Sequence, residues 1–111
     1  MATVYKILGS AVVVADTSTG LYTVPASNSA LVSSIVVCNT GTSERTFRIA
    51  MVPGAISAIQ IQHYIFYDVP IPANDSFIAT CGYTLATGNS ILVRASHADV
   101  VFSAYGTEIS T

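Results

Sequence analysis

Charged side chains are scarce in this sequence, with only 10 among its 111 residues. A soluble domain usually carries about 25% charged residues, and these keep separate molecules dissolved and apart. A chain that largely dispenses with charge is expected to keep part of its surface against other subunits. The scarcity therefore favours an assembly subunit over a solitary globular protein.

Positive charge is rarest, with a single lysine and three arginines against six acidic residues. Nucleic-acid binding needs clustered Lys and Arg to neutralise phosphates, and anionic membrane surfaces attract the same side chains. The net charge of this chain is −2, which disfavours binding to either. We therefore expect neither nucleic acid nor a membrane as a partner.

Cysteine is also rare, and both residues, Cys38 and Cys81, lie in apolar, strand-like segments. A disulfide framework usually needs more cysteines at closer spacing, and a zinc site needs a paired cysteine or a nearby histidine. Two interpretations of the cysteines stay open. They are buried thiols that behave as small hydrophobic side chains, or they form one disulfide between facing strands. No metal or other cofactor is expected.

Helix-forming residues are few, whereas Val, Ile, Thr, Tyr and Phe are common and turn residues recur at short intervals. This pattern predicts an all-β fold, a single-domain antiparallel β-sandwich over residues 1–111, jelly-roll-like, with about eight strands. Strands are expected at 4–14, 21–24, 30–38, 45–51, 63–70, 76–81, 90–95 and 99–105, with a short extended segment at 82–86. A helical turn is expected within 55–62, across one end of the sandwich.

Catalytic patterns do not stand out. His97 and Asp99 have the spacing of an H-x-D iron site, but the other histidine, His63, precedes them instead of following them. The serines lack a G-x-S-x-G turn, and the glycines lack the spacing of a phosphate loop. The sequence therefore predicts that the protein is not an enzyme.

Residues 63–67 read His-Tyr-Ile-Phe-Tyr and form the densest aromatic cluster. Strand alternation would turn Tyr64 and Phe66 to one face and His63, Ile65 and Tyr67 to the other. Three interpretations stay open: aromatics shared between core and surface, a subunit contact, or a platform on which a carbohydrate stacks.

Arginine and aromatic residues are enriched at protein interfaces. Segment 45–51 alternates so that Arg48 points outward, and Arg94 occupies a similar position on a later strand. The candidate partner contacts combine these two arginines with the aromatic cluster. They are Arg48, His63, Tyr64, Phe66, Tyr67 and Arg94.

Short segments in order along nearly the whole chain carry a family resemblance. They are ATVYKILG (2–9), LYTVPA (21–26), VCN (37–39), TFRIA (46–50), QHY (62–64), DVPI (68–71), AND (73–75) and VFS (101–103), followed by Gly106, Glu108 and Ile109. Together they resemble a group of small structural proteins of tailed-bacteriophage virions. The uncharged, isoleucine-rich stretch 52–61 departs from that pattern.

The resemblance implies a non-enzymatic virion protein, most simply a cement or decoration subunit that stabilises the head by bridging capsid proteins. A neck, tail or baseplate component is the alternative within the same class, and a carbohydrate-binding host-recognition module is the alternative from another. The implied partners are the major capsid protein or other virion proteins, together with copies of the chain itself. A homotrimer would suit a three-fold axis of a capsid.

Overall fold

The computed structural model describes residues 2–110, except for the side chain of Cys81. These residues form eight strands and two short 3-10 turns. The strands are β1 (Thr3–Val12), β2 (Thr19–Thr23), β3 (Asn28–Asn39), β4 (Arg45–Val52), β5 (Tyr64–Ile71), β6 (Ser76–Leu85), β7 (Ser90–Ala95) and β8 (Val100–Ser110). The turns are η1 (Ile56–Ala58) and η2 (Ile61–His63).

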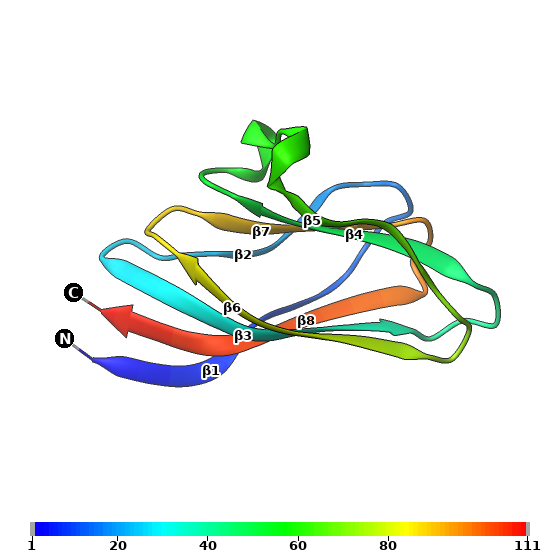
Figure 1. The fold of residues 1–111 in the computed structure, drawn as a ribbon, viewed down its shortest axis with the longest axis horizontal. Helices are drawn as coiled ribbons and strands as arrows, with labels where there is room; N and C mark the ends of the chain where they lie inside the picture. The colour runs from blue at the N-terminus through cyan, green and yellow to red at the C-terminus, as the bar shows by residue number, and fades with distance from the viewer. Residues whose placement is uncertain (1, 111) are drawn as a thin grey trace.

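The strands form two antiparallel four-stranded sheets that pack face to face (Figure 1). One sheet has the order β1-β8-β3-β6 and the other β2-β7-β4-β5. The chain changes sheet at every connection except the one between β4 and β5. Eight strands wound in this way form the double-sheet jelly roll. The prediction of an all-β, jelly-roll-like sandwich is therefore confirmed.

Two predicted strand boundaries were wrong, both because of long-range pairing. Residues 82–85 are not a separate segment, because β6 continues through a bulge where its register against β3 shifts between Val32 and Ser34. Strand β8 does not end at residue 105 but continues to Ser110, because it pairs with the start of β1, where Thr3 lies opposite Ile109. Neither partner strand is visible in the local sequence pattern.

The core between the sheets centres on Phe47 of β4, which is 1% exposed. Its ring centroid lies 5.4 Å from that of Phe77 and 6.3 Å from that of Phe102, both in the opposite sheet, and 6.1 Å from that of Phe66 in its own. The tilted and edge-on ring arrangements are those that aromatic quadrupoles prefer. Phe47 therefore joins the two layers.

The segment between β4 and β5 lies over the outward face of the β2-β7-β4-β5 sheet (Figure 1). Ile56 and Ile59, together with Tyr64, pack onto the small buried cluster of Ala50, Val52 and Leu92. The expected helical turn is thus present as η1 and η2. It covers part of a sheet face, however, where the sequence had suggested an end of the sandwich.

One end of the sandwich is closed by three polar side chains. The Tyr22 hydroxyl of β2 donates to Glu108 Oε2 of β8 at 2.5 Å, and Lys6 Nζ of β1 lies 3.2 Å from Glu108 Oε1. The hydrogen bond from Tyr22 holds the pKa of the Glu108 carboxyl below its usual range. Burial and the adjacent carboxylate raise the pKa of Tyr22. The contact ties β2 of one sheet to β1 and β8 of the other.

Replacing Tyr22 with phenylalanine should lower the free energy of unfolding by about 1 kcal/mol near pH 6. Because the pKa of Glu108 is depressed in the folded state, its stabilisation is present above its unfolded pKa of about 4.3 and is lost as pH falls through the folded value. The difference in the free energy of unfolding between wild type and Y22F should therefore be smaller at pH 3 than at pH 6. Urea denaturation of dilute protein at pH 6 and pH 3 measures this difference, with Y5F as a control at a ring that is 82% exposed. An unchanged difference would contradict this account.

Gly106 lets β8 approach β3 closely. A Cβ at this position would lie 2.1 Å from the Leu31 carbonyl oxygen, whereas nothing lies within 4 Å of a Cβ at Gly82. We expect G106A to lower the melting temperature by roughly 10 °C, because the backbone must shift to relieve the overlap. G82A is the matched control and should melt within about 2 °C of wild type. Calorimetry or thermal circular dichroism makes the comparison.

Cys38 is a free, half-buried thiol. Its partner in the β3–β6 register is Ser76. Cys81 lies five residues further along β6, which places its Cα about 16 Å from that of Cys38 at roughly 3.3 Å per residue. A disulfide needs Cα atoms within about 7 Å. The backbone register therefore excludes the cross-strand disulfide, one of the two interpretations above, while the side chain of Cys81 lies outside the described residues.

Candidate functional site

A bidentate ion pair lies on the outward face of the β2-β7-β4-β5 sheet. Arg48 Nε lies 2.6 Å from Asp68 Oδ1, and Arg48 Nη2 lies 3.2 Å from Asp68 Oδ2. Arg94 of β7 stands directly opposite Arg48 in the strand register, and its Nη2 lies 4.0 Å from Asp16 Oδ1. Two cations opposite one another would repel. The two carboxylates offset that repulsion.

The Arg48–Asp68 contact fixes the charge of both groups. The hydrogen bond from Arg48 holds the pKa of the Asp68 carboxyl below its usual range, and the same bond raises the pKa of Arg48. Both side chains therefore remain charged across the physiological range. The pair can hold a guanidinium in place for binding, but it supplies neither an acid nor a base near neutral pH.

Two tyrosines flank the guanidinium. The Arg48 Cζ atom lies 4.0 Å from the ring centroid of Tyr67 and 5.9 Å from that of Tyr64. The two rings meet edge to face at 85°, with centroids 5.0 Å apart. Tyr67 is 49% exposed. We call Arg48, Tyr64, Tyr67, Asp68 and Arg94 the arginine–tyrosine cluster.

Bulges in β5 create this cluster. The register against β4 shifts between Phe47 and Ile49 and again between Ile49 and Ala50. Asp68 has a positive φ of 51° at the first shift. Simple alternation had separated Tyr64 from Tyr67, because it would place them on opposite faces. The second of these shifts, at Ile65, brings both rings to the same side as Arg48, and that part of the sequence expectation was wrong.

The other two candidate contacts lie elsewhere. Phe66 packs inward, with its ring 5.2 Å from that of Phe77 and 6.1 Å from that of Phe47. His63 ends η2, where its Nδ1 accepts a hydrogen bond from the Gln60 amide. The structure thus brings together Arg48, Tyr64, Tyr67 and Arg94. It places Phe66 against the core and His63 in the covering turn.

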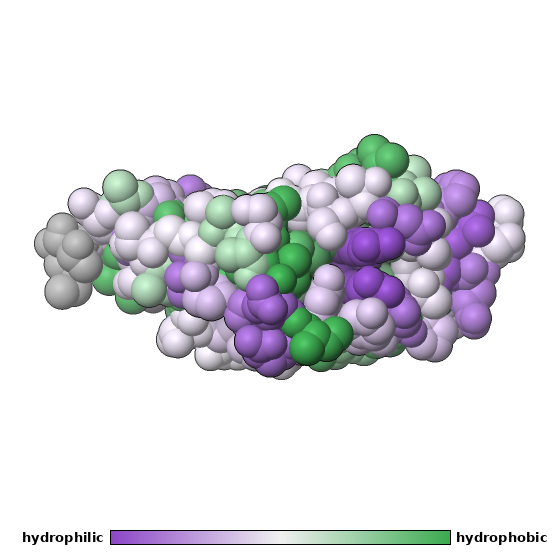
Figure 2. Space-filling model, turned by 90° about the horizontal axis from the view of Figure 1, so that it is seen from above, coloured by the Kyte–Doolittle hydropathy of each residue, from purple (hydrophilic) through white to green (hydrophobic). Residues whose placement is uncertain are grey.

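Figure 2 shows this outward face in space-filling form. Hydrophilic side chains gather on the half away from the end where β1 begins and β8 ends, and hydrophobic ones lie among and beside them. The face is therefore mixed in character. Ion pairs near a protein surface contribute little to stability.

The opposite outward face, on the β1-β8-β3-β6 sheet, is uncharged among the described side chains. Four rows of register neighbours cross it. They are Val12–Val101–Cys38–Ser76, Ser10–Ser103–Val36–Ile78, Ile7–Tyr105–Ser34–Thr80 and Tyr5–Thr107–Leu31–Thr84. The charged residues of these four strands, Lys6 and Glu108, point to the other side of the sheet, where Tyr22 lies. We call the four rows the uncharged face.

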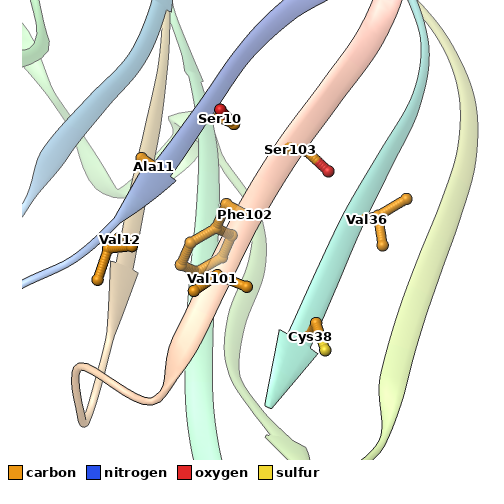
Figure 3. A pocket seen from close by; sticks show the side chains of 8 residues that line it. All are labelled: Ser10, Ala11, Val12, Val36, Cys38, Val101, Phe102 and Ser103. Carbon is orange, nitrogen blue, oxygen red and sulfur yellow. The ribbon is translucent and has the colours of Figure 1, made fainter. Parts of the chain in front are cut away.

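Large apolar side chains stand out from the uncharged face. Ile7 is 60% exposed, Val12 70% and Ile78 63%. Beside Val12, over β8 and between β1 and β3, lies a shallow depression of about 300 Å³ whose lining includes Ser10, Ser103 and Val36 (Figure 3). Contiguous apolar surface of this kind usually marks an interaction site.

Sequence reasoning anticipated an uncharged surface from the low charge count, but it did not locate one. The sequence did contain a sign of this surface, because segments 28–39 and 76–85 have no charged residue. Only the sheet order shows that these two strands are neighbours and that the uncharged outward halves of β1 and β8 extend the same surface.

The His97–Asp99 pair forms a turn. His97 Nδ1 lies 3.2 Å from Asp99 Oδ2 and accepts a hydrogen bond from the Asp99 amide at 3.1 Å. Arg45 Nη2 lies 3.2 Å from the same carboxylate oxygen. Within the part of the chain that the structure describes, no three His, Cys, Asp or Glu side chains come together in a way that could hold a metal ion.

No protein-family model matches the sequence, and no curated protein matches it significantly. Over residues 2–110 the structure has no helix of the length and hydrophobicity that crossing a membrane requires.

Proposed function

We propose that this chain is a non-enzymatic structural protein of a bacteriophage virion, a cement subunit that stabilises the head by bridging capsid proteins. The observation that carries the proposal is the pair of outward faces on opposite sides of one jelly-roll sandwich. One is broad and uncharged, and the other presents the arginine–tyrosine cluster. Jelly rolls occur in viral capsid proteins and in lectins, so the fold is compatible with this role without specifying it.

A bridging subunit must contact at least two neighbours, and the two faces supply two different kinds of contact. The arginine–tyrosine cluster combines the residue types that dominate the energetics of interfaces. Asp68 and Tyr67 already hold the Arg48 guanidinium in one orientation, so little side-chain entropy remains to be lost on binding. We propose that this cluster contacts the major capsid protein, or another virion protein, and that the uncharged face contacts copies of the chain.

The family resemblance described above supports the virion assignment, since its segments follow one another over nearly the whole chain. The scarcity of charge supports assembly in general, because hydroxyl and aliphatic side chains can be buried without the desolvation cost of an ion. The chemistry of the site supports a binding role, because Arg48 and Asp68 hold each other in the charged form and offer no acid or base near neutral pH.

Copy number in purified particles tests the proposal directly. Quantitative gel densitometry should find hundreds of copies of a cement protein per particle. A few to tens of copies would replace the cement role with a neck, tail or baseplate position. Absence from particles, combined with binding of the isolated protein on a glycan array, would favour the carbohydrate-binding module instead, with Tyr67 as its stacking ring.

Substitution of Arg48 tests the contact surface. R48Q should weaken binding to particles that lack the protein by about tenfold or more, because it removes both the charge and the bidentate geometry. E44Q is the control, since Glu44 is exposed and lies outside the cluster. Binding is measured by co-sedimentation with the particles. Equal binding by both variants would assign the capsid contact to another surface.

A further inference from the structure

We propose that a second copy of this chain covers the uncharged face, with the two-fold axis between the copies parallel to the strands. The inference rests on the assembly role proposed above and deepens it, because it names the partner of this face and its geometry. A two-fold contact uses the same patch on both subunits, so the patch must be complementary to itself.

The direction of the axis determines which strands meet. Rotation about an axis parallel to the strands reverses the strand order and preserves each row. Strand β1 of one copy then lies over β6 of the other, and β8 lies over β3. Each row of four therefore meets the same row of the partner, read backwards.

Read in this way, every row matches a large side chain with a smaller one. The facing pairs are Val12 with Ser76, Val101 with Cys38, Ile78 with Ser10, Val36 with Ser103, Ile7 with Thr80, Tyr105 with Ser34, Tyr5 with Thr84 and Leu31 with Thr107. Two packed sheets fill the space between them best when large and small residues alternate across the interface.

The depression on the face fits this arrangement. Ser10 and Ser103 form part of its lining, and Figure 3 shows them side by side on β1 and β8. In the pairing proposed, Ile78 and Val36 of the second copy project toward these two serines. The protruding side chains of one copy thus enter the hollow of the other.

An axis perpendicular to the strands fits less well. It would place each strand over itself and exchange the outer rows, so that Val12 would meet Tyr5 and Ser76 would meet Thr84. The edge formed by β1 would then be overfilled at both ends, and the edge formed by β6 would be left with gaps. Both defects cost packing energy.

The size of the face suits a stable dimer. Four strands about 4.8 Å apart and about ten residues long cover an area of roughly 19 by 33 Å. This is about 600 Å² in projection, before the roughness of the side chains is counted, and a standard interface buries about 800 Å² per partner. Because the rows carry no charge, burying them leaves no ion without a partner. The proposed contact makes a dimer, which differs from the homotrimer expected from the sequence.

Sedimentation equilibrium of the full chain tests the dimer. Wild type should sediment as a dimer at about 50 µM, since interfaces of this size bind with micromolar or tighter affinity. Val36 lies in a central row close to the axis, so V36E brings two carboxylates together and should weaken dimerisation at least 100-fold. I61E is the matched control, because Ile61 is 72% exposed but lies on η2, beyond the opposite sheet. It should leave the dimer unchanged.

A size swap tests the facing pairs themselves. I78S should weaken the dimer about tenfold by leaving a hollow, and S10I should weaken it by placing two isoleucines against each other. The double variant S10I/I78S restores one large and one small side chain at each contact, and it should recover most of the affinity. A residue that merely supports the monomer fold would show no such rescue.

A wild-type chain that is monomeric at this concentration would overturn the inference. So would a trimer that V36E leaves intact, or a double variant no tighter than its singles. These outcomes are independent of the copy number in particles, which tests the virion role separately. A dimer in solution with no copies in particles would uphold the contact and refute the proposed function. A monomer in solution with hundreds of copies in particles would refute the contact and uphold the proposed function.

Discussion

Replacing Phe47 with alanine is expected to lower the free energy of unfolding by about 3–5 kcal/mol. Phe47 is 1% exposed, and its ring contacts phenylalanines from both sheets. Truncation removes buried apolar area and leaves a cavity between two layers whose backbones are fixed by their hydrogen bonds, so the site can collapse only in part. Domains of this size are stable by about 5–15 kcal/mol in total, and F47A is therefore expected to be close to unfolding. Urea denaturation followed by circular dichroism measures the change.

Tyr5 offers the control for this experiment. It loses an aromatic ring of similar size in Y5A, but the ring is 82% exposed, so the loss should stay within about 0.5 kcal/mol. The measurement is made on dilute protein, below the concentration at which the uncharged face would pair. A similar loss in F47A and Y5A would mean that the aromatic contacts between the sheets do not hold the layers together.

Replacing Asn39 with aspartate should cost about 3–5 kcal/mol at pH 7. Asn39 is fully buried, and its Nδ2 donates to the carbonyl oxygens of Ser43 at 2.8 Å and Ile71 at 3.1 Å. Its Oδ1 accepts from the Gly41 amide at 3.0 Å. A carboxylate can replace the acceptor but not the donor. It would face two carbonyl oxygens in a site without solvent.

The loss in N39D should depend on pH. Burial raises the pKa of a carboxyl above the unfolded value of about 3.9. The penalty is therefore complete above the folded pKa, and it shrinks as pH falls through that value, because the protonated acid can donate one hydrogen bond. Urea denaturation at pH 7 and pH 4.5 should show the smaller loss at the lower pH. N74D, at an exposed turn position, should show little loss at either pH, and a pH-independent loss in N39D would contradict the hydrogen-bond account.

Residue patterns predicted some features of the candidate site and missed others. The clean alternation around Arg48 placed that side chain outward, because a regular strand has a period of two. The positions of Tyr64 and Phe66 could not be obtained in the same way, since bulges in β5 change the period where those residues lie. The extra residue that separates Tyr64 from Phe66 is Ile65, because Ile49 pairs with Phe66 and Ala50 pairs with Tyr64. The residues around Ile65 give no sign of this bulge in the sequence.

Composition and alternation by themselves determined that this protein is all-β, that most of its strands lie where they do, and that it carries little charge. These properties depend on residues close together in the chain. Only the tertiary structure decided which surface of the protein carries no charge. The jelly-roll order brings β1, β8, β3 and β6 side by side, although the segments come from both ends and the middle of the sequence. Strand pairing acts across long sequence separations, so a continuous uncharged surface exists only after the chain has folded.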